Sequence, residues 1–207
     1  MLSLLKKRST ICTNDSKFKE IADKLLNKTE LVINDKRFRI CEVEFYLHCK
    51  THLDEYTHCD DLQQEYGKLY FHRFRNGVYK SGTYKCMDLT LGDRDSGTYL
   101  GILIRSIREL SNGTMYNGPC KSVDRLLREF DCESVKDLEK KEQFPIDMVR
   151  NKKVRLVSAK LNPEPIYIGP RIGLSDKYPE FHKKLYRYVI MINDVKKEKT
   201  KLVKSEN

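Results

Sequence analysis

Strand-like patterning between residues 29 and 108 constrains the fold of this 207-residue chain more than any other feature. The segments "TELVI" and "FRICEVEFYLH" flank "NDKR", whose Asn-Asp pair suits a turn, so residues 29–48 are expected to form a β-hairpin. Further strand-like runs at 68–74, 83–91 and 98–108 are separated by glycine-containing turns. The middle of the chain is therefore predicted to be a sheet.

Helical patterns flank this central region. Apolar residues recur at helical spacing over residues 15–28, which predicts an amphipathic helix. Two more helices are expected within 120–130 and 134–144, and the second has Ser134 and Asp137 at the spacing of a capping box. Short strands are predicted at 153–161, 165–168 and 185–192.

These elements predict an α+β fold with a mainly antiparallel sheet surrounded by α-helices. The length suits one domain. We expect the domain to span residues 16–195, after an N-terminal extension over residues 1–15. Residues 196–207 are charged and lack periodicity, so they are expected to form a disordered tail.

The charge of the chain favours a polyanionic partner. Forty Lys and Arg against thirty Asp and Glu give a formal charge of +10, and residues 196–207 contribute only five Lys against two Glu. A folded body with this excess attracts phosphates, since each neutralised phosphate releases counterions. Nucleic acid is the first candidate, and a basic protein without such a partner is the alternative.

The seven cysteines include no CxxC pair, which argues against a disulfide framework and favours a reducing compartment. The chain begins with too short an apolar run for a signal peptide and has no stretch near the roughly 18 apolar residues of a membrane span. We therefore expect a cytoplasmic or nuclear protein without a membrane partner.

Strand geometry indicates where a site can form. Successive strand residues point to opposite faces, so Glu42, Glu44 and Tyr46 share one face while Val43 and Phe45 share the apolar face. A carboxylate two residues from a tyrosine ring, on the face opposite the core, marks a candidate pocket.

The same sorting predicts that other strands contribute to this pocket. It aligns Tyr70 with His72, Cys86 with Asp88, and places Arg105 on a matching face. Together they would supply carboxylates, flat rings and one guanidinium, which suits an extruded base held by stacking and attacked by activated water. Taken singly, each residue also fits an ordinary exposed strand face.

Zinc binding is a rival interpretation of the same region. Zinc ligands usually come in pairs at short, regular spacing, which this region lacks. The ligand-type residues are His48, Cys49, His52, His58, Cys59 and His72.

Several motifs, in collinear order, resemble the alkyladenine (3-methyladenine) DNA glycosylase family of the vertebrate type. "EVEFYLH" is similar to the family's "VETEAYLG", "GKLYFH" to "GTLYVY", "CMDLT" to "CMNIS" and "ILIRSIREL" to "VLLRALEPL". "NGPCKSVDRLL", "PRIGL" and "KKLYRYVI" continue the match, which covers roughly residues 18 to 190. The resemblance implies a curved sheet and a divergent member of the family.

The resemblance also implies residue roles in hydrolysis. The family's general base, which activates the water that attacks the sugar C1′, falls on Glu44. The arginine that helps to hold this water falls on Arg105, and a backbone carbonyl with the same task falls on Ile172. Bond breaking develops positive charge on the sugar, which a carboxylate stabilises while taking a proton from water.

The base-binding positions show departures from the family. The sandwiching rings fall on Tyr46 and on His72, where the family has tyrosine, and the stacking histidine falls on His58. Asp88 stands where the family has asparagine. An ionised carboxylate only accepts hydrogen bonds, so the sequence favours a modified base with donor groups, other than 3-methyladenine.

The hairpin "RFRNGVYKSGTY" is longer than the family's and lacks its intercalating tyrosine. Phe74 or Tyr79 is the candidate wedge for the gap left by the flipped nucleotide.

We expect a monomeric, monofunctional DNA glycosylase that acts on double-stranded DNA without a cofactor, in repair or in defence against modified foreign DNA. No lysine occupies the expected nucleophile position, so water rather than an amine should attack. The alternative is a nucleic-acid-binding protein that reads a flipped modified base without cutting it.

Overall fold

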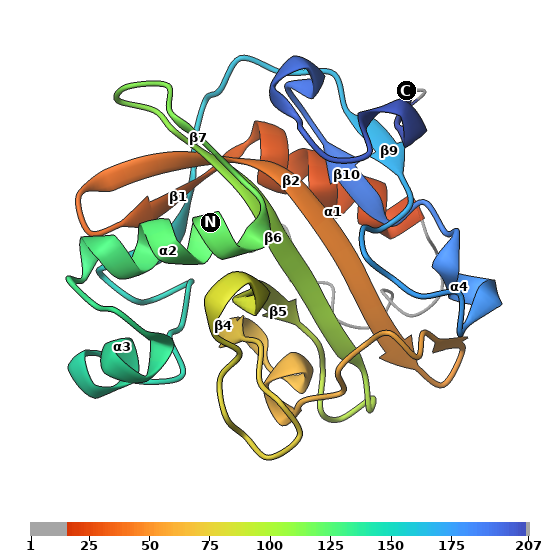
Figure 1. Cartoon of the computed structure of the whole chain (residues 1–207), viewed down its shortest axis with the longest axis horizontal. Helices are drawn as coiled ribbons and strands as arrows, with labels where there is room; N and C mark the ends of the chain where they lie inside the picture. Colours follow the sequence, from red (N-terminus) through yellow and green to blue (C-terminus); the bar gives the residue numbers. More distant parts are fainter. Residues whose placement is uncertain (1–15, 206–207) are drawn as a thin grey trace.

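The computed structural model describes residues 16–205, and the predicted extension over residues 1–15 lies outside them. Within this range the strands form one mostly antiparallel, open sheet in the order β11-β9-β10-β2-β6-β5-β4, with β1, β3, β7 and β8 paired beside this path (Figure 1). The strands are β1 (Thr29–Ile33), β2 (Lys36–Cys49), β3 (His52–Leu53), β4 (Tyr66–Phe71), β5 (Met87–Leu91), β6 (Tyr99–Glu109), β7 (Met115–Asn117), β8 (Val154–Ser158), β9 (Tyr167–Gly169), β10 (Arg187–Val189) and β11 (Val203–Lys204).

Four α-helices occur in the described chain, so the predicted α+β single domain is confirmed. They are α1 (Ser16–Asn27), α2 (Pro119–Glu129), α3 (Val135–Lys141) and α4 (Pro179–His182), with short 3₁₀ turns η3 (Asp61–Gln64), η4 (Gly82–Tyr84), η5 (Ile192–Asp194) and η6 (Lys199–Lys201). None of these helices is long and apolar enough to cross a membrane.

The hairpin of β1 and β2 forms as predicted, because Asn34 adopts a left-handed turn conformation at φ 50°. The predicted helix start at Ser134 is also confirmed, since its hydroxyl accepts a hydrogen bond from the amide of Asp137. Residues 83 and 84, expected within a strand over 83–91, instead belong to η4, and β5 begins only at Met87.

The core lies between α1 and the sheet. Phe45 of β2 stacks on Phe18 of α1, with ring centroids 4.5 Å apart, and both rings are fully buried. Val43 and Leu47 share this apolar face, as the alternation predicted. The other face of β2, which carries the predicted site, therefore points away from α1.

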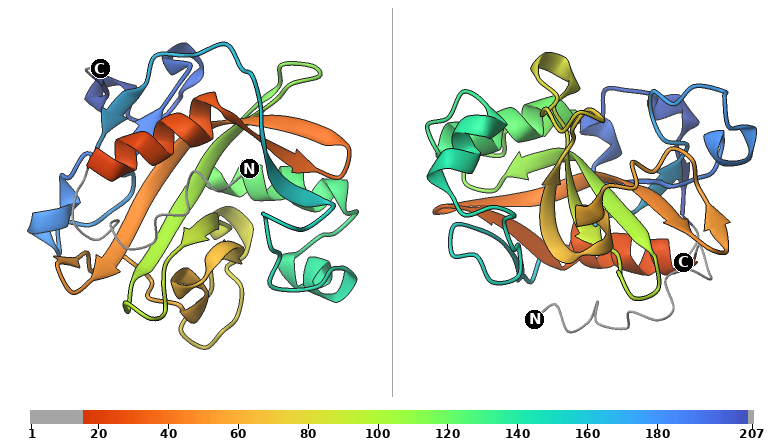
Figure 2. Two further views of the ribbon diagram at one scale, coloured as in Figure 1. Left: turned by 180° about the vertical axis from the view of Figure 1, so that it is seen from behind. Right: turned by 90° about the horizontal axis from the view of Figure 1, so that it is seen from below.

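Helix α2 lies on the sheet face opposite α1, as the front and back views show (Figures 1 and 2). Its residue Ser122 is buried, and the Ser122 hydroxyl donates to the carbonyl of Arg105 in β6 at 3.1 Å. This hydrogen bond fixes the start of α2 next to the predicted arginine.

The prediction of a disordered tail from residue 196 is wrong for the residues up to 205. Strand β11 pairs with β9, with Val203 opposite Ile168, and η6 precedes it. Gly169 has no side chain, which leaves room for Leu202 to pack against its backbone. Backbone pairing and this apolar contact order a segment whose charged composition suggested disorder.

Candidate active site

A β-bulge between β2 and β6 builds the centre of the site. Glu42 is opposite Ser106 and Val43 is opposite Ile104, so Arg105 is an extra residue on β6 without a partner on β2. A bulge bends its strand and re-aims the side chains beside it. As a result, the adjacent residues Arg105 and Ser106 both reach the same carboxylate on β2.

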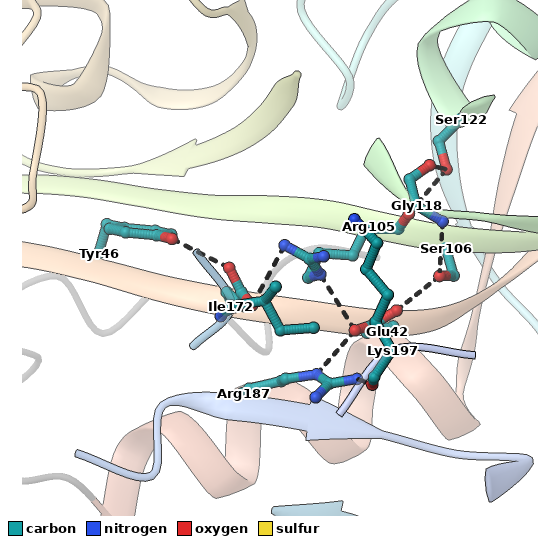
Figure 3. Close-up of polar contacts among 10 residues, drawn as sticks. Glu42, Tyr46, Arg105, Ser106, Gly118, Ser122, Ile172, Arg187 and Lys197 are labelled. Atoms are coloured by element: carbon teal, nitrogen blue, oxygen red, sulfur yellow. Dashed lines mark hydrogen bonds and ion pairs between the residues drawn. The ribbon is translucent and has the colours of Figure 1, made fainter. Parts of the chain in front are cut away.

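That carboxylate belongs to Glu42, whose contacts Figure 3 shows. Glu42 is 3% exposed. Its Oε1 accepts from Arg105 Nε at 3.0 Å and from Arg187 Nε at 2.7 Å, and its Oε2 accepts from the Ser106 hydroxyl at 2.6 Å. Arg187 is fully buried on β10 and also donates to the carbonyl of Lys197 at 2.9 Å. Glu42 thus joins three strands and the C-terminal segment.

Glu44, the predicted general base, is fully buried next to this network. Its Oε1 accepts from the Ile172 amide at 2.8 Å and lies 3.3 Å from Arg105 Nη1. Its Oε2 accepts from the Tyr46 hydroxyl at 2.9 Å. Oε2 therefore keeps one free acceptor position in the described contacts, because a carboxylate oxygen offers two.

Burial and the neighbouring Glu44 carboxylate raise the pKa of Tyr46 well above its usual value, so the phenol stays protonated and donates to Glu44. Burial disfavours the charged form of Arg105, but the Glu44 and Glu42 carboxylates outweigh this and raise its pKa. We call Glu42, Glu44, Arg105 and Arg187 the carboxylate wall. Its two acids and two guanidiniums balance in charge.

The structure brings the predicted residues Glu44, Arg105, Ile172 and Tyr46 together, but one contact differs from the prediction. Ile172 touches Glu44 through its amide N–H. The role of its carbonyl in holding a water stays a prediction. Glu42, which the sequence analysis placed on this face without giving it a role, lines the cavity, whereas Glu44 does not.

A second wall of the site consists of His58, Tyr70, His72 and Asp88, which we call the ring wall. The His58 and His72 rings lie 4.4 Å apart, and Tyr70 lies 5.5 Å from His72. The Tyr70 hydroxyl is 3.1 Å from His58 Nδ1. The predicted convergence of the strand faces is therefore confirmed for β4 and β5, and His58, placed by the resemblance, lies next to them in the loop before η3.

His72 and Asp88 form a buried ion pair. His72 Nε2 lies 2.7 Å from Asp88 Oδ1, and Asp88 is 1% exposed. Burial alone would lower the pKa of His72, but the charge and hydrogen bond of Asp88 outweigh it and raise this pKa to about 9. Burial and the nearby His72 lower the pKa of His58 to about 4, so only one of the two imidazoles is charged near neutral pH.

The carboxylate of Asp88 has protein partners on both oxygens. Gln63 donates to Oδ2 at 3.4 Å, while His72 occupies Oδ1. Gly101 of β6 permits this arrangement, since a Cβ there would lie 2.5 Å from Asp88 Oδ2 and from Gln63 Nε2. The sequence treated Asp88 as a free acceptor for donor groups of a base, whereas each of its oxygens already accepts one hydrogen bond from the protein.

Between the two walls lies a cavity of about 900 Å³. Glu42, Tyr46, Tyr56, His58, His72, Asp88, Arg105 and Ile172 line it. Lysines also line it, namely Lys80, Lys121, Lys196 and Lys197. The last two come from the segment expected to be disordered, so no sequence signal pointed to them.

The two predicted wedge residues do not line this cavity. Phe74 is 52% exposed on the loop after β4, whereas the Tyr79 hydroxyl lies 3.1 Å from Glu139 of α3. Tyr84, at the end of η4, lines the cavity and is 73% exposed. Its sequence signal was an aromatic residue directly before the segment "KCMD".

The histidines considered as zinc ligands contact different groups of the protein. His52 contacts the Leu47 carbonyl and the Tyr186 hydroxyl, at 2.8 and 2.9 Å, while His58 and His72 belong to the ring wall. Within residues 16–205, no group of three or more His, Cys, Asp or Glu side chains is arranged to hold a metal ion.

No protein-family model matches the chain. The chain is similar to a protein of Acanthamoeba polyphaga mimivirus described as "Uncharacterized protein L759". The two sequences are 42% identical over 202 residues, which cover 91% of this chain and 93% of the relative.

Proposed function

We propose that this chain, which belongs to the same family as the mimivirus protein L759, is a monofunctional DNA glycosylase. It flips a modified base of double-stranded DNA into the cavity and hydrolyses the N-glycosidic bond with a water activated by Glu44. The observation that carries this proposal is the buried contact of Glu44 with Arg105, Tyr46 and Ile172 beside a cavity lined by rings.

The contacts of Glu44 suit the chemistry of a general base. Tyr46 and Ile172 hold the carboxylate in one orientation, and the free acceptor position on Oε2 can take a proton from water. The negative charge of the same carboxylate stabilises the positive charge that develops on the sugar. In this proposal Arg105, which contacts both Glu42 and Glu44, orients the water.

The lysines around the cavity suit the DNA backbone. Lys80, Lys121, Lys196 and Lys197 form no ion pair among the described contacts, so their charge is available to phosphates. Flipping costs a few kcal/mol of unstacking, and contacts to phosphates together with stacking in the pocket offset this cost.

Tyr84 is the side chain that we propose as the wedge, because it is an exposed ring at the cavity. Tyr84→Ala is expected to reduce flipping about tenfold, since an unfilled gap lets the base return to the stack. A fluorescent base analogue opposite the lesion measures flipping. Phe74→Ala removes an exposed ring away from the cavity and should change little, so a larger loss in Phe74→Ala would contradict this placement.

One observation favours a second function, a reader that binds a flipped base without cutting it. Glu44 is fully buried and does not line the cavity, whereas a general base must reach a water next to the sugar. In a reader, Glu44 and Arg105 would only shape the pocket.

Mass spectrometry of released bases distinguishes the two functions. Wild type and Glu44→Gln are incubated with alkylated, deaminated and naturally hypermodified DNA. If the protein is a glycosylase, wild type releases a free base and Glu44→Gln does not. Wild type then also leaves an abasic strand that breaks after alkali treatment. Equal, tight binding by both proteins without release would support the reader and refute hydrolysis.

A further inference from the structure

The ring wall has a cationic side chain, His72, at the surface of the cavity. Asp88 is buried, and a buried carboxylate needs a cationic partner or loses its charge. The short contact with His72 supplies that partner, and the neighbouring Gln63 amide supplies a second donor. His72 lines the cavity as an imidazolium next to its counter-ion Asp88, whose two oxygens already have protein partners.

The Tyr46 ring is also backed by a cation. The guanidinium of Arg171 lies 4.5 Å from the Tyr46 centroid, and Arg171 is itself buried and paired with Asp54. A cation held on one face of the ring already draws on its π electrons. Stacking a cationic base on the other face of Tyr46 is therefore less favourable than on a free tyrosine.

The charges around the cavity that have no partner of opposite sign among the described residues are all positive. The lining acids are all paired within the protein: Glu42 with Arg105 and Arg187, Asp88 with His72, and Asp124 with Lys85. The four lining lysines form no ion pair among the described contacts. The cavity is consequently electropositive, and a cleft lined by one sign of charge attracts ligands of the opposite sign.

We propose that this pocket accepts an uncharged or anionic base with oxo or carboxylate acceptors and rejects cationic N-alkylated purines. The inference rests on the proposed function, in which the cavity receives a flipped base. It reverses the preference that a free Asp88 would give, because the Asp88 oxygens already accept from His72 and Gln63, and the unpaired charges at the cavity, within residues 16–205, are the four lysines.

The test uses three DNA duplexes that differ in one base: cationic 7-methylguanine, neutral hypoxanthine, or anionic 5-carboxylcytosine. Single-turnover release is measured for each, and binding is measured separately with 2′-fluoroarabino sugars, which resist hydrolysis. We expect wild type to favour hypoxanthine and 5-carboxylcytosine over 7-methylguanine by at least about tenfold.

The double variant His72→Tyr, Asp88→Asn removes the ion pair without leaving a buried charge alone. It should reduce this preference by about tenfold. Asp88→Asn alone, which deprives His72 of its counter-ion, should shift the preference in the same direction. His182→Tyr makes the same ring substitution outside the cavity and should leave it unchanged.

The outcomes separate this inference from the proposed function. If wild type binds 7-methylguanine more tightly, or releases it faster, than the other two bases, the inference is refuted. Release of 7-methylguanine would still agree with the proposed glycosylase activity. Selective binding of the two acceptor-bearing bases without any release supports the inference and refutes hydrolysis. Equal affinity for all three duplexes, without release of any base, refutes both the inference and the proposed function.

Discussion

The carboxylate wall and the ring wall both bury acids, but they neutralise them in different ways. Glu42 and Glu44 face Arg105 and Arg187, whose guanidiniums keep their charge at any ordinary pH. Asp88 depends on one imidazole. The cations of the wall assigned to the reaction therefore stay charged, while the cation of the wall assigned to selection is lost as pH rises through about 9.

Removing Glu42 should give the largest effect on stability. Glu42→Ala leaves Arg105 and Arg187 buried with too little negative charge, and breaking a buried ion pair in this way costs about 3–5 kcal/mol. Urea unfolding measures the loss. Glu65→Ala breaks an exposed pair with Arg94 and serves as the control, which should scarcely change the unfolding midpoint. Similar midpoints for both variants would contradict the role of Glu42.

The ring wall should make stability depend on pH. The pKa of His72 rises from 6.5 to about 9 on folding, so its ion pair contributes fully below pH 6.5 and is lost as pH rises through about 9. The shift corresponds to about 3 kcal/mol. The groups facing His72 are Asp88, Cys86, His58 and Tyr70.

His58 should make stability depend on pH in the opposite direction. Its pKa falls to about 4 on folding, so the unfolded chain binds a proton more readily and stability falls as pH drops from 6.5 towards 4. Urea unfolding of wild type and Asp88→Asn from pH 5 to pH 10 isolates the His72 contribution. The two curves should converge at high pH, and a constant difference up to pH 10 would refute the ion pair.

The lysines should give a smaller effect, visible in the salt dependence of DNA binding. Lys80→Glu, Lys121→Glu and Lys197→Glu together should weaken binding uniformly across sequences. The slope of log affinity against log salt should fall by about 1 for each phosphate that is no longer neutralised. Fluorescence anisotropy measures this slope.

A matched triple variant controls for the change in net charge. Lys36→Glu, Lys152→Glu and Lys160→Glu make the same substitution on exposed residues outside the cavity. Their slope should stay close to that of wild type. Equal slopes for the two triple variants would contradict the proposal that the cavity lysines contact DNA phosphates.

The carboxylate wall was largely predictable because it follows strand alternation. Glu42 and Glu44 share a face with Tyr46 by spacing alone. The contact of Arg187 with Glu42 was not predictable, because the pairing of β10 with β2 joins residues far apart in the chain. The bulge at Arg105 likewise depends on a register that no local pattern reveals.

The ring wall was predicted in membership but not in chemistry. Alternation placed His72 and Asp88 on faces that converge, yet the loop between β4 and β5 leaves open which residues pair. The position of Lys196 and Lys197 was missed for another reason. A charged run indicates solvent exposure, and the pairing of β11 with β9 rests on only two residues from each strand.

Base release and DNA affinity, measured together for Glu44→Gln under single-turnover conditions, decide whether this carboxylate activates water. We predict that the rate of nucleobase release falls at least about 1000-fold while affinity for the same duplex changes little. The variant keeps the shape of the pocket but lacks the carboxylate that acts as general base. Release at the wild-type rate would contradict the assignment of Glu44 and with it the proposed hydrolytic mechanism.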